Sequence, residues 1–199
     1  VQILFVNTNH EESRMMQTRN LFVLEDFAEA QIFERHQACN QGHVFSNSVT
    51  ESSVGNQAHF KHFKLQNDLD SSSMVDSTFV KQGANSSALV DTFAFSGELV
   101  RNNLHFEFTG MHAEAHMDAI TLLKGKSLVD HHTFVDHAVP HCQSNQLYKG
   151  IYDEKSKGVF NGKVMVRKDA QKTNAFQQNN NLLLLSLIHI SEPTRLTSI

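Results

Sequence analysis

The 199-residue chain has no tryptophan, only two prolines and only two cysteines, Cys39 and Cys142. Two cysteines are too few for a disulfide framework, so we expect a reducing, cytoplasmic compartment. Seventeen Lys and Arg residues against 21 Asp and Glu residues give a formal net charge of −4. That balance argues against nucleic acid as a partner, because nucleic-acid surfaces need clustered positive charge.

Long hydrophobic runs are also missing. The most apolar stretch, LLLLSLIHI at residues 182–190, is shorter than the roughly 20 residues that a membrane-spanning helix needs. The first residues, VQILFVNTNH, lack the basic region and the cleavage site of a signal peptide. We therefore expect no membrane association. Because the chain also lacks an initiator Met, we interpret Val1 as a cut within a longer protein.

Most of the chain alternates apolar and polar residues with a period of two. Leu104, Phe106 and Phe108 are expected on one face of a strand, with His105 and Glu107 on the other. Gly, Asn, Asp and Ser clusters separate such segments, and no long segment has a helical period. This pattern predicts a nearly all-β fold.

A longer period overlies the strands, since polar turns followed by a small residue recur along the chain. The first four of these small residues are separated by 28, 30 and 27 residues. This spacing predicts a parallel β-helix with rungs of about 28 residues and without terminal caps. A β-sandwich, the alternative, predicts hairpin turns without a long period. The recurring small residues are Ala30, Ala58, Ala88, Ala115, Cys142 and Ala170.

Four histidines and a cysteine fall within twelve residues, at His131, His132, His137, His141 and Cys142. Imidazole and thiolate are common ligands of zinc and iron. The spacing matches neither CxxC nor HExxH, and strand alternation places His131 and His137 on one face and His132 on the other. His141 and Cys142 remain the candidate metal ligands. Cys142 also fits a small buried position, since free cysteine often packs as an apolar residue.

Three histidines, His131 among them, have the parity that we assign to the solvated faces of the sheets. These are His105, His116 and His131. We expect them to be surface residues without a functional role.

The segment PHCQSNQLYKGIYDEKSKGVFNGKVMVRKDAQKTNAFQQNNNLLL, residues 140–184, resembles the SufB/SufD family of iron–sulfur cluster assembly scaffolds. The order HCxSxQLYKG, GVFNGK, AQKT and NLLL is similar to the SufD branch in particular. The stretches RNLFVLEDFAEAQIFERH and GELVRNNLHFEFTGMHAEAHMDAITLLKGKSLVDHHTFVDH are also similar to this family. The resemblance spans residues 1–184.

The resemblance implies a right-handed parallel β-helix and a scaffold that catalyses no reaction. It implies pairing with a SufB-like subunit through the β-helix and with a SufC-like ATPase through a C-terminal domain. No cofactor would be bound stably, and an iron–sulfur cluster would be held transiently in the intact complex. The family's cluster-assembly Cys and His lie in an ADDVKCSHGAT-type motif after NLLL, so they correspond to no residue here. If His141 and Cys142 face the SufB-like partner, they are expected to assist iron or sulfur transfer.

Residues 185–199, LSLIHISEPTRLTSI, depart from the family pattern and match a translated sequencing adaptor. We therefore expect a β-helix core at residues 1–184 and no native structure at 185–199. The coding DNA tests this, because the adaptor reads CTGTCTCTTATACACATC over residues 185–190.

Two other functions stay open on pattern alone. A β-helix enzyme acting on polysaccharide would need a carboxylate or basic cluster and often aromatic platforms, whereas the acids here are scattered and Trp is absent. A His-rich metal-binding module would use the histidines named above. The residue-level resemblance favours the scaffold.

Overall fold

The computed structural model describes residues 1–7, 13–38, 42–67 and 71–184. Over these ranges the chain forms thirteen strands and no helix, so the all-β prediction is confirmed. No helix capable of crossing a membrane is therefore found in the described ranges. The strands are β1 (Gln2–Asn7), β2 (Arg14–Leu24), β3 (Glu29–Ala38), β4 (Val44–Val54), β5 (His59–Gln66), β6 (Ser73–Gln82), β7 (Ser87–Ala94), β8 (Leu99–Phe108), β9 (Glu114–Leu123), β10 (Leu128–His137), β11 (Gln143–Asp153), β12 (Lys157–Val166) and β13 (Asn174–Leu184).

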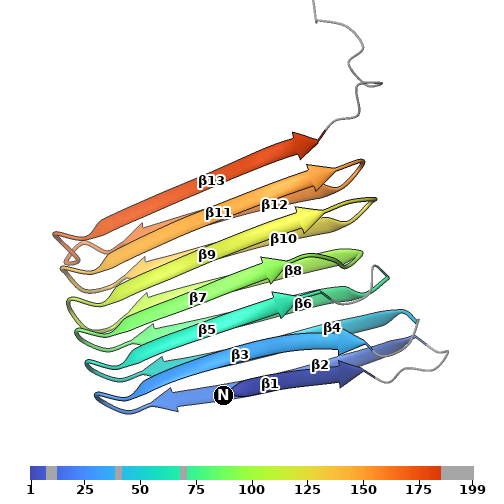
Figure 1. The fold of residues 1–199 in the computed structure, drawn as a ribbon. Helices are drawn as coiled ribbons and strands as arrows, with labels where there is room; N and C mark the ends of the chain where they lie inside the picture. The colour runs from blue at the N-terminus through green and yellow to red at the C-terminus, as the bar shows by residue number, and fades with distance from the viewer. Residues whose placement is uncertain (8–12, 39–41, 68–70, 185–199) are drawn as a thin grey trace, which may run out of the picture.

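The strands wind into two facing sheets, with successive rungs stacked from β1 to β13 (Figure 1). Sheet A has the order β1-β3-β5-β7-β9-β11-β13, and sheet B has the order β12-β10-β8-β6-β4-β2. All pairings between neighbouring strands are parallel. A chain that alternates between two parallel sheets is a β-solenoid. The predicted parallel β-helix is thus confirmed, and the hairpin-linked β-sandwich is excluded.

One turn of the solenoid takes about 29 residues, close to the predicted rung. In sheet A, Glu29 pairs with His59, which pairs with Ser87, then Glu114, then Gln143. The interval between paired residues ranges from 26 to 31 over both sheets. Adjacent rungs therefore differ in turn length while their strands stay in register.

The predicted row of small residues is partly wrong. Ala88 and Ala115 pair with each other, and Phe60 stands between Ala30 and Ala88. Ala58 and Cys142 lie one inward position earlier, in the row that contains Ala113, and Ala170 lies in the turn before β13. Variable turn lengths displaced Ala58 and Cys142 by two residues from the row of Ala88 and Ala115, and Ala170 by five, which a spacing count cannot detect.

At one end of the strands, each rung turns through a residue in the left-handed region. Most side chains avoid this conformation because Cβ approaches the carbonyl oxygen. Backbone hydrogen bonds between successive turns hold it, as where Gln57 N donates to the Ala84 carbonyl oxygen at 2.8 Å. The equivalent turn residues are Phe27 (φ 66°), Gln57 (58°), Asn85 (55°), His112 (60°), His141 (63°) and Lys172 (59°).

The interior contains two apolar clusters separated by a polar band. Along β8, Val100 belongs to the smaller cluster, Asn102 to the polar band, and Leu104 and Phe106 to the larger cluster. Leu104, Phe106 and Phe108 point inward, as predicted. Burial of these apolar rows supplies the main favourable free energy of the fold, about 25 cal/mol per Å². The polar band is the unusual feature of this core.

Candidate functional site

The predicted metal ligands, His141 and Cys142, lie in the turn between β10 and β11 and point to opposite sides of the backbone. The Cys142 side chain is buried, and its Sγ donates to the carbonyl oxygen of Gly110 at 3.4 Å. Burial raises the pKa of the Cys142 thiol. A neutral, buried thiol is a poor nucleophile and a poor ligand. The interpretation of Cys142 as a small core residue is confirmed, in a row with Ala113.

His141 is exposed, and its ring stacks on the ring of His112 from the turn one rung earlier. The ring centroids are 5.0 Å apart and the planes differ by 20°. Sequence reasoning did not single out His112. The sequence does place His112 about one rung before His141. That spacing identifies the two as neighbours only when the turn lengths are known.

The other histidines of this stretch follow the predicted strand alternation. His131 and His137 face inward and His132 faces outward, beside Asp130 at 2.9 Å. The expectation that His131 is a solvated surface residue is wrong. Its Nε2 is hydrogen bonded to Thr121 Oγ1 at 3.0 Å, and burial lowers its pKa to about 4, so the ring is neutral.

His105 and His116 lie on the outer faces, as predicted. The His105 ring lies between Phe79 and Phe134, with centroids at 5.8 and 4.7 Å, and burial lowers its pKa. His116 Nε2 is 2.8 Å from Glu114 Oε1. Within the described ranges, no three His, Cys, Asp or Glu side chains come together as a metal site.

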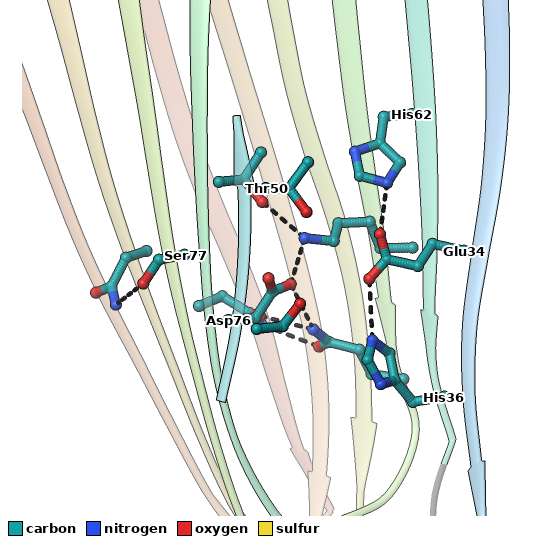
Figure 2. A network of polar contacts seen from close by, with 12 residues as sticks. Glu34, His36, Thr50, His62, Asp76 and Ser77 are labelled. Carbon is teal, nitrogen blue, oxygen red and sulfur yellow. Dashed lines mark hydrogen bonds and ion pairs between the residues drawn. The ribbon is translucent and has the colours of Figure 1, made fainter. Parts of the chain in front are cut away.

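A cluster of charged side chains lies in the polar band near the N-terminal rungs (Figure 2). Glu34 of β3 points between two histidines, with Oε1 2.9 Å from His36 Nε2 and Oε2 3.0 Å from His62 Nε2. Burial would raise the pKa of Glu34, but Lys64 and the two imidazole hydrogen bonds outweigh it and hold the pKa below its usual range. Burial lowers the pKa of His62, so a neutral ring donates to the carboxylate.

Lys64 of β5 reaches across the interior and forms an ion pair with Asp76 of β6. Its Nζ also donates to Thr78 Oγ1 at 2.6 Å. Burial would lower the pKa of Lys64, but the Asp76 and Glu34 carboxylates outweigh it and the pKa is raised. Asp76 then accepts from Gln66 Nε2 at 3.3 Å, which extends the network along the band.

This network is closed to substrates. Glu34, His62, Lys64 and Asp76 are each at most 3% exposed. A cavity beside His131, farther along the polar band, has about 10 Å³, roughly the space of one water. The network therefore joins strands and sheets in one register, and it does not bind a ligand from solution.

Comparison with known proteins agrees with this architecture. The family model for the SUF system FeS cluster assembly, SufBD core domain, matches residues 5–190. An iron–sulfur cluster assembly SufBD family protein of Synechocystis sp. is 32% identical over 96% of this chain and 44% of its own length. The iron–sulfur cluster assembly protein SufD of Escherichia coli is 27% identical over 94% of this chain and 44% of its own length.

The chloroplastic protein ABCI7 of Arabidopsis thaliana is 32% identical over 89% of this chain and 38% of its own length. The chain thus spans less than half the length of these relatives. A family model that covers nearly the whole solenoid decides the family. The chain belongs to the SufBD core domain family of the SUF iron–sulfur cluster assembly system.

Proposed function

We propose that this chain is the β-solenoid of a SufD-type scaffold subunit, which supports iron–sulfur cluster assembly without catalysing a reaction itself. The match of the SufBD core model to residues 5–190 carries this proposal. The solenoid supports it, because Glu34, His62, Lys64 and Asp76 are sealed inside the core and form structural pairs. The HCQSNQLYKG segment and the similarity to the E. coli SufD protein favour the SufD branch.

In this function the solenoid binds a SufB-like subunit, and a C-terminal domain of the longer protein binds a SufC-like ATPase. The iron–sulfur cluster is cargo, held transiently by the complex in the cytoplasm. His141 and Cys142 stay proposed contributors to iron or sulfur transfer. The buried Cys142 thiol would need exposure by a local opening of its turn, whereas His141 is accessible at once.

Co-expression tests the partner assignment. The tagged 199-residue chain is expressed with the SufB-like protein or with the SufC-like protein of the same source, and complexes are isolated by affinity and size-exclusion chromatography. We expect the SufB-like protein to co-elute and the SufC-like protein alone to be lost. An unrelated parallel β-solenoid serves as the control bait. Retention of the SufC-like protein alone, or loss of the SufB-like one, would contradict the assignment.

We also propose that residues 1–184 make up the native solenoid and that residues 185–199 are translated adaptor. Residues 185–199 lie outside the described ranges. The family model runs to residue 190, past the last described strand. The coding DNA decides the point: any codons other than the adaptor sequence at residues 185–190 would contradict the adaptor assignment.

A further inference from the structure

We propose that His112 and His141 form an open, two-imidazole binding site for a divalent transition-metal ion such as Cu²⁺, Ni²⁺ or Zn²⁺. The site lies on the turn edge of the solenoid. Both rings are exposed, and they stack with centroids 5.0 Å apart. The pair replaces the adjacent His141 and Cys142 as the accessible ligands, because the Cys142 thiol lies on the buried side of the turn.

The fold brings these two rings together by a specific device. His112 and His141 are equivalent turn residues with φ of 60° and 63°, so their side chains leave the backbone in nearly the same direction. Parallel stacking spaces such residues by one rung, about 4.8 Å. The near-parallel rings follow from this repeat, and they place two nitrogen ligands side by side.

The backbone beneath the pair is held firmly. Ala113 and Cys142, the next residues of the two turns, are each 1% exposed. Gln143 N donates to the Ala113 carbonyl oxygen at 2.9 Å, and His141 N donates to the Gln171 carbonyl oxygen at 3.1 Å. The two Cα positions are thus fixed, so that metal binding would reorient only the two exposed rings. Such preorganisation reduces the ordering cost of binding an ion.

Two other outward-facing histidines, the exposed His59 and the half-buried His132, already have side-chain partners. The His59 ring is hydrogen bonded to Ser87 Oγ at 2.7 Å, and His132 is 2.9 Å from an Asp130 carboxylate oxygen. Within the described part of the chain, the rings of the proposed site contact each other and accept or donate no side-chain hydrogen bond. Their nitrogens are therefore available.

The ligand chemistry determines the class of ion. Neutral imidazole suits Cu²⁺, Ni²⁺, Zn²⁺ and Fe²⁺, with Cu²⁺ bound most tightly among them. A metal–nitrogen distance of about 2.0–2.1 Å requires the two ligating nitrogens to lie within about 4.2 Å of each other. Rotation of the exposed rings permits this. Two protein ligands leave the remaining coordination positions open to water or to a partner's side chain, so the ion would exchange readily.

The test is a Cu²⁺ titration of the full 199-residue chain, followed by calorimetry and by electron paramagnetic resonance. We expect His112→Ala and His141→Ala each to weaken Cu²⁺ binding at one site by about a hundredfold, since each removes one of the two imidazole ligands. Nitrogen hyperfine coupling should change from two imidazoles to one. The double variant should lose the site.

The control is the variant His43→Ala/His59→Ala, which removes the same number of exposed imidazoles and should bind as the wild type does. Cys142→Ala should also retain the site. His10 and His189, which lie outside the described residues, are present in all variants and cancel in the comparison. Unchanged binding in the double variant, or equal losses in the control, would overturn the proposal. The result is independent of the scaffold function, which complex formation tests separately.

Discussion

The early and late rungs of this solenoid share a backbone but fill its interior with different chemistry. One inward row of sheet A contains Glu34 and Lys64 on β3 and β5, after Ile3 on β1, and continues with Thr92, Ala119 and Tyr148 on the next three strands. From β3 onward the row thus passes from charged to neutral residues at equivalent backbone positions. Because each rung contributes one side chain to a row, the interior can change character along the axis while the strand register stays the same.

The different interiors predict that the two halves respond differently to substitution. In apolar rungs, a substitution lowers the free energy of unfolding in proportion to the buried surface and volume that it removes. Buried charges instead depend on every partner, since removal of one leaves another charge uncompensated in the core. Lys64 pairs across the two sheets with Asp76, and Glu34 joins adjacent strands through His62. The early rungs are therefore expected to be the more sensitive half to single substitutions.

The largest expected effect is that of Lys64→Met. It leaves the buried Asp76 and Glu34 carboxylates without their cation, so we expect a loss of about 3–5 kcal/mol in the free energy of unfolding. Urea denaturation measures it. Lys61→Met on the same strand is the matched control; Lys61 is exposed, and its replacement should stay within about 0.5 kcal/mol. If Lys64→Met and Lys61→Met lowered the free energy of unfolding equally, the early rungs would not depend on the buried charge of Lys64.

Met117→Ala tests the late, apolar rungs. The side chain is fully buried, so the lost contacts and the cavity should cost about 2–5 kcal/mol. Ile120→Ala on the same strand removes a side chain that is 49% exposed and should cost about 0.5 kcal/mol. If Met117→Ala destabilised the protein more than Lys64→Met does, the proposed order of sensitivity would be reversed.

His131 gives the late rungs a dependence on acid. Its pKa is about 4 in the folded chain and 6.5 in the reference state, so the unfolded state binds more protons between these values. Its contribution to stability is complete above pH 6.5 and is lost as the pH falls toward 4, at about 1.4 kcal/mol per pH unit. His131→Gln should flatten the pH dependence of urea unfolding, whereas His43→Gln, at an exposed position, should leave it unchanged. If His131→Gln left the pH dependence of the unfolding free energy unchanged, His131 would not be the group responsible for it.

The smallest effect concerns the outer face of the middle rungs. Burial and the neighbouring Asp118 raise the pKa of Asp91 to about 6, so the folded chain binds more protons than the unfolded chain between about pH 4 and 6. Stability is therefore lost as the pH rises through that window. Asp91→Asn should slightly raise the urea midpoint at pH 7 and leave it unchanged at pH 4. Asp118→Asn should lower the pKa of Asp91, measurable by NMR titration, and an unchanged pKa would show that the two carboxylates do not interact.

Part of this architecture could be predicted from the sequence. The alternation of Leu104, Phe106 and Phe108 and the recurring turns were sufficient for the parallel β-solenoid, because period and parity are local properties. The inward polar band also left a signal, since His62 and Lys64 share the parity of the buried Phe60. His131 was assigned to the solvated face, although it shares the parity of the buried Val129 and Val135 on the same strand.

The partners of these residues could not be predicted. Lys64 meets Asp76 from the opposite sheet, and His112 meets His141 from the next turn. Both pairings depend on turn lengths that vary from rung to rung. A spacing count averages over that variation, so it finds the fold and misplaces individual contacts.

The variable rung length has a consequence for how the chain folds. Each new rung closes a loop of 26 to 31 residues on the rung before it. The entropy of closure grows only with the logarithm of loop length, so the shortest and longest rungs differ by about 0.2 kcal/mol. Growth of the solenoid is therefore a series of nearly equal steps, and the rate of folding should depend on how the first pair of rungs nucleates.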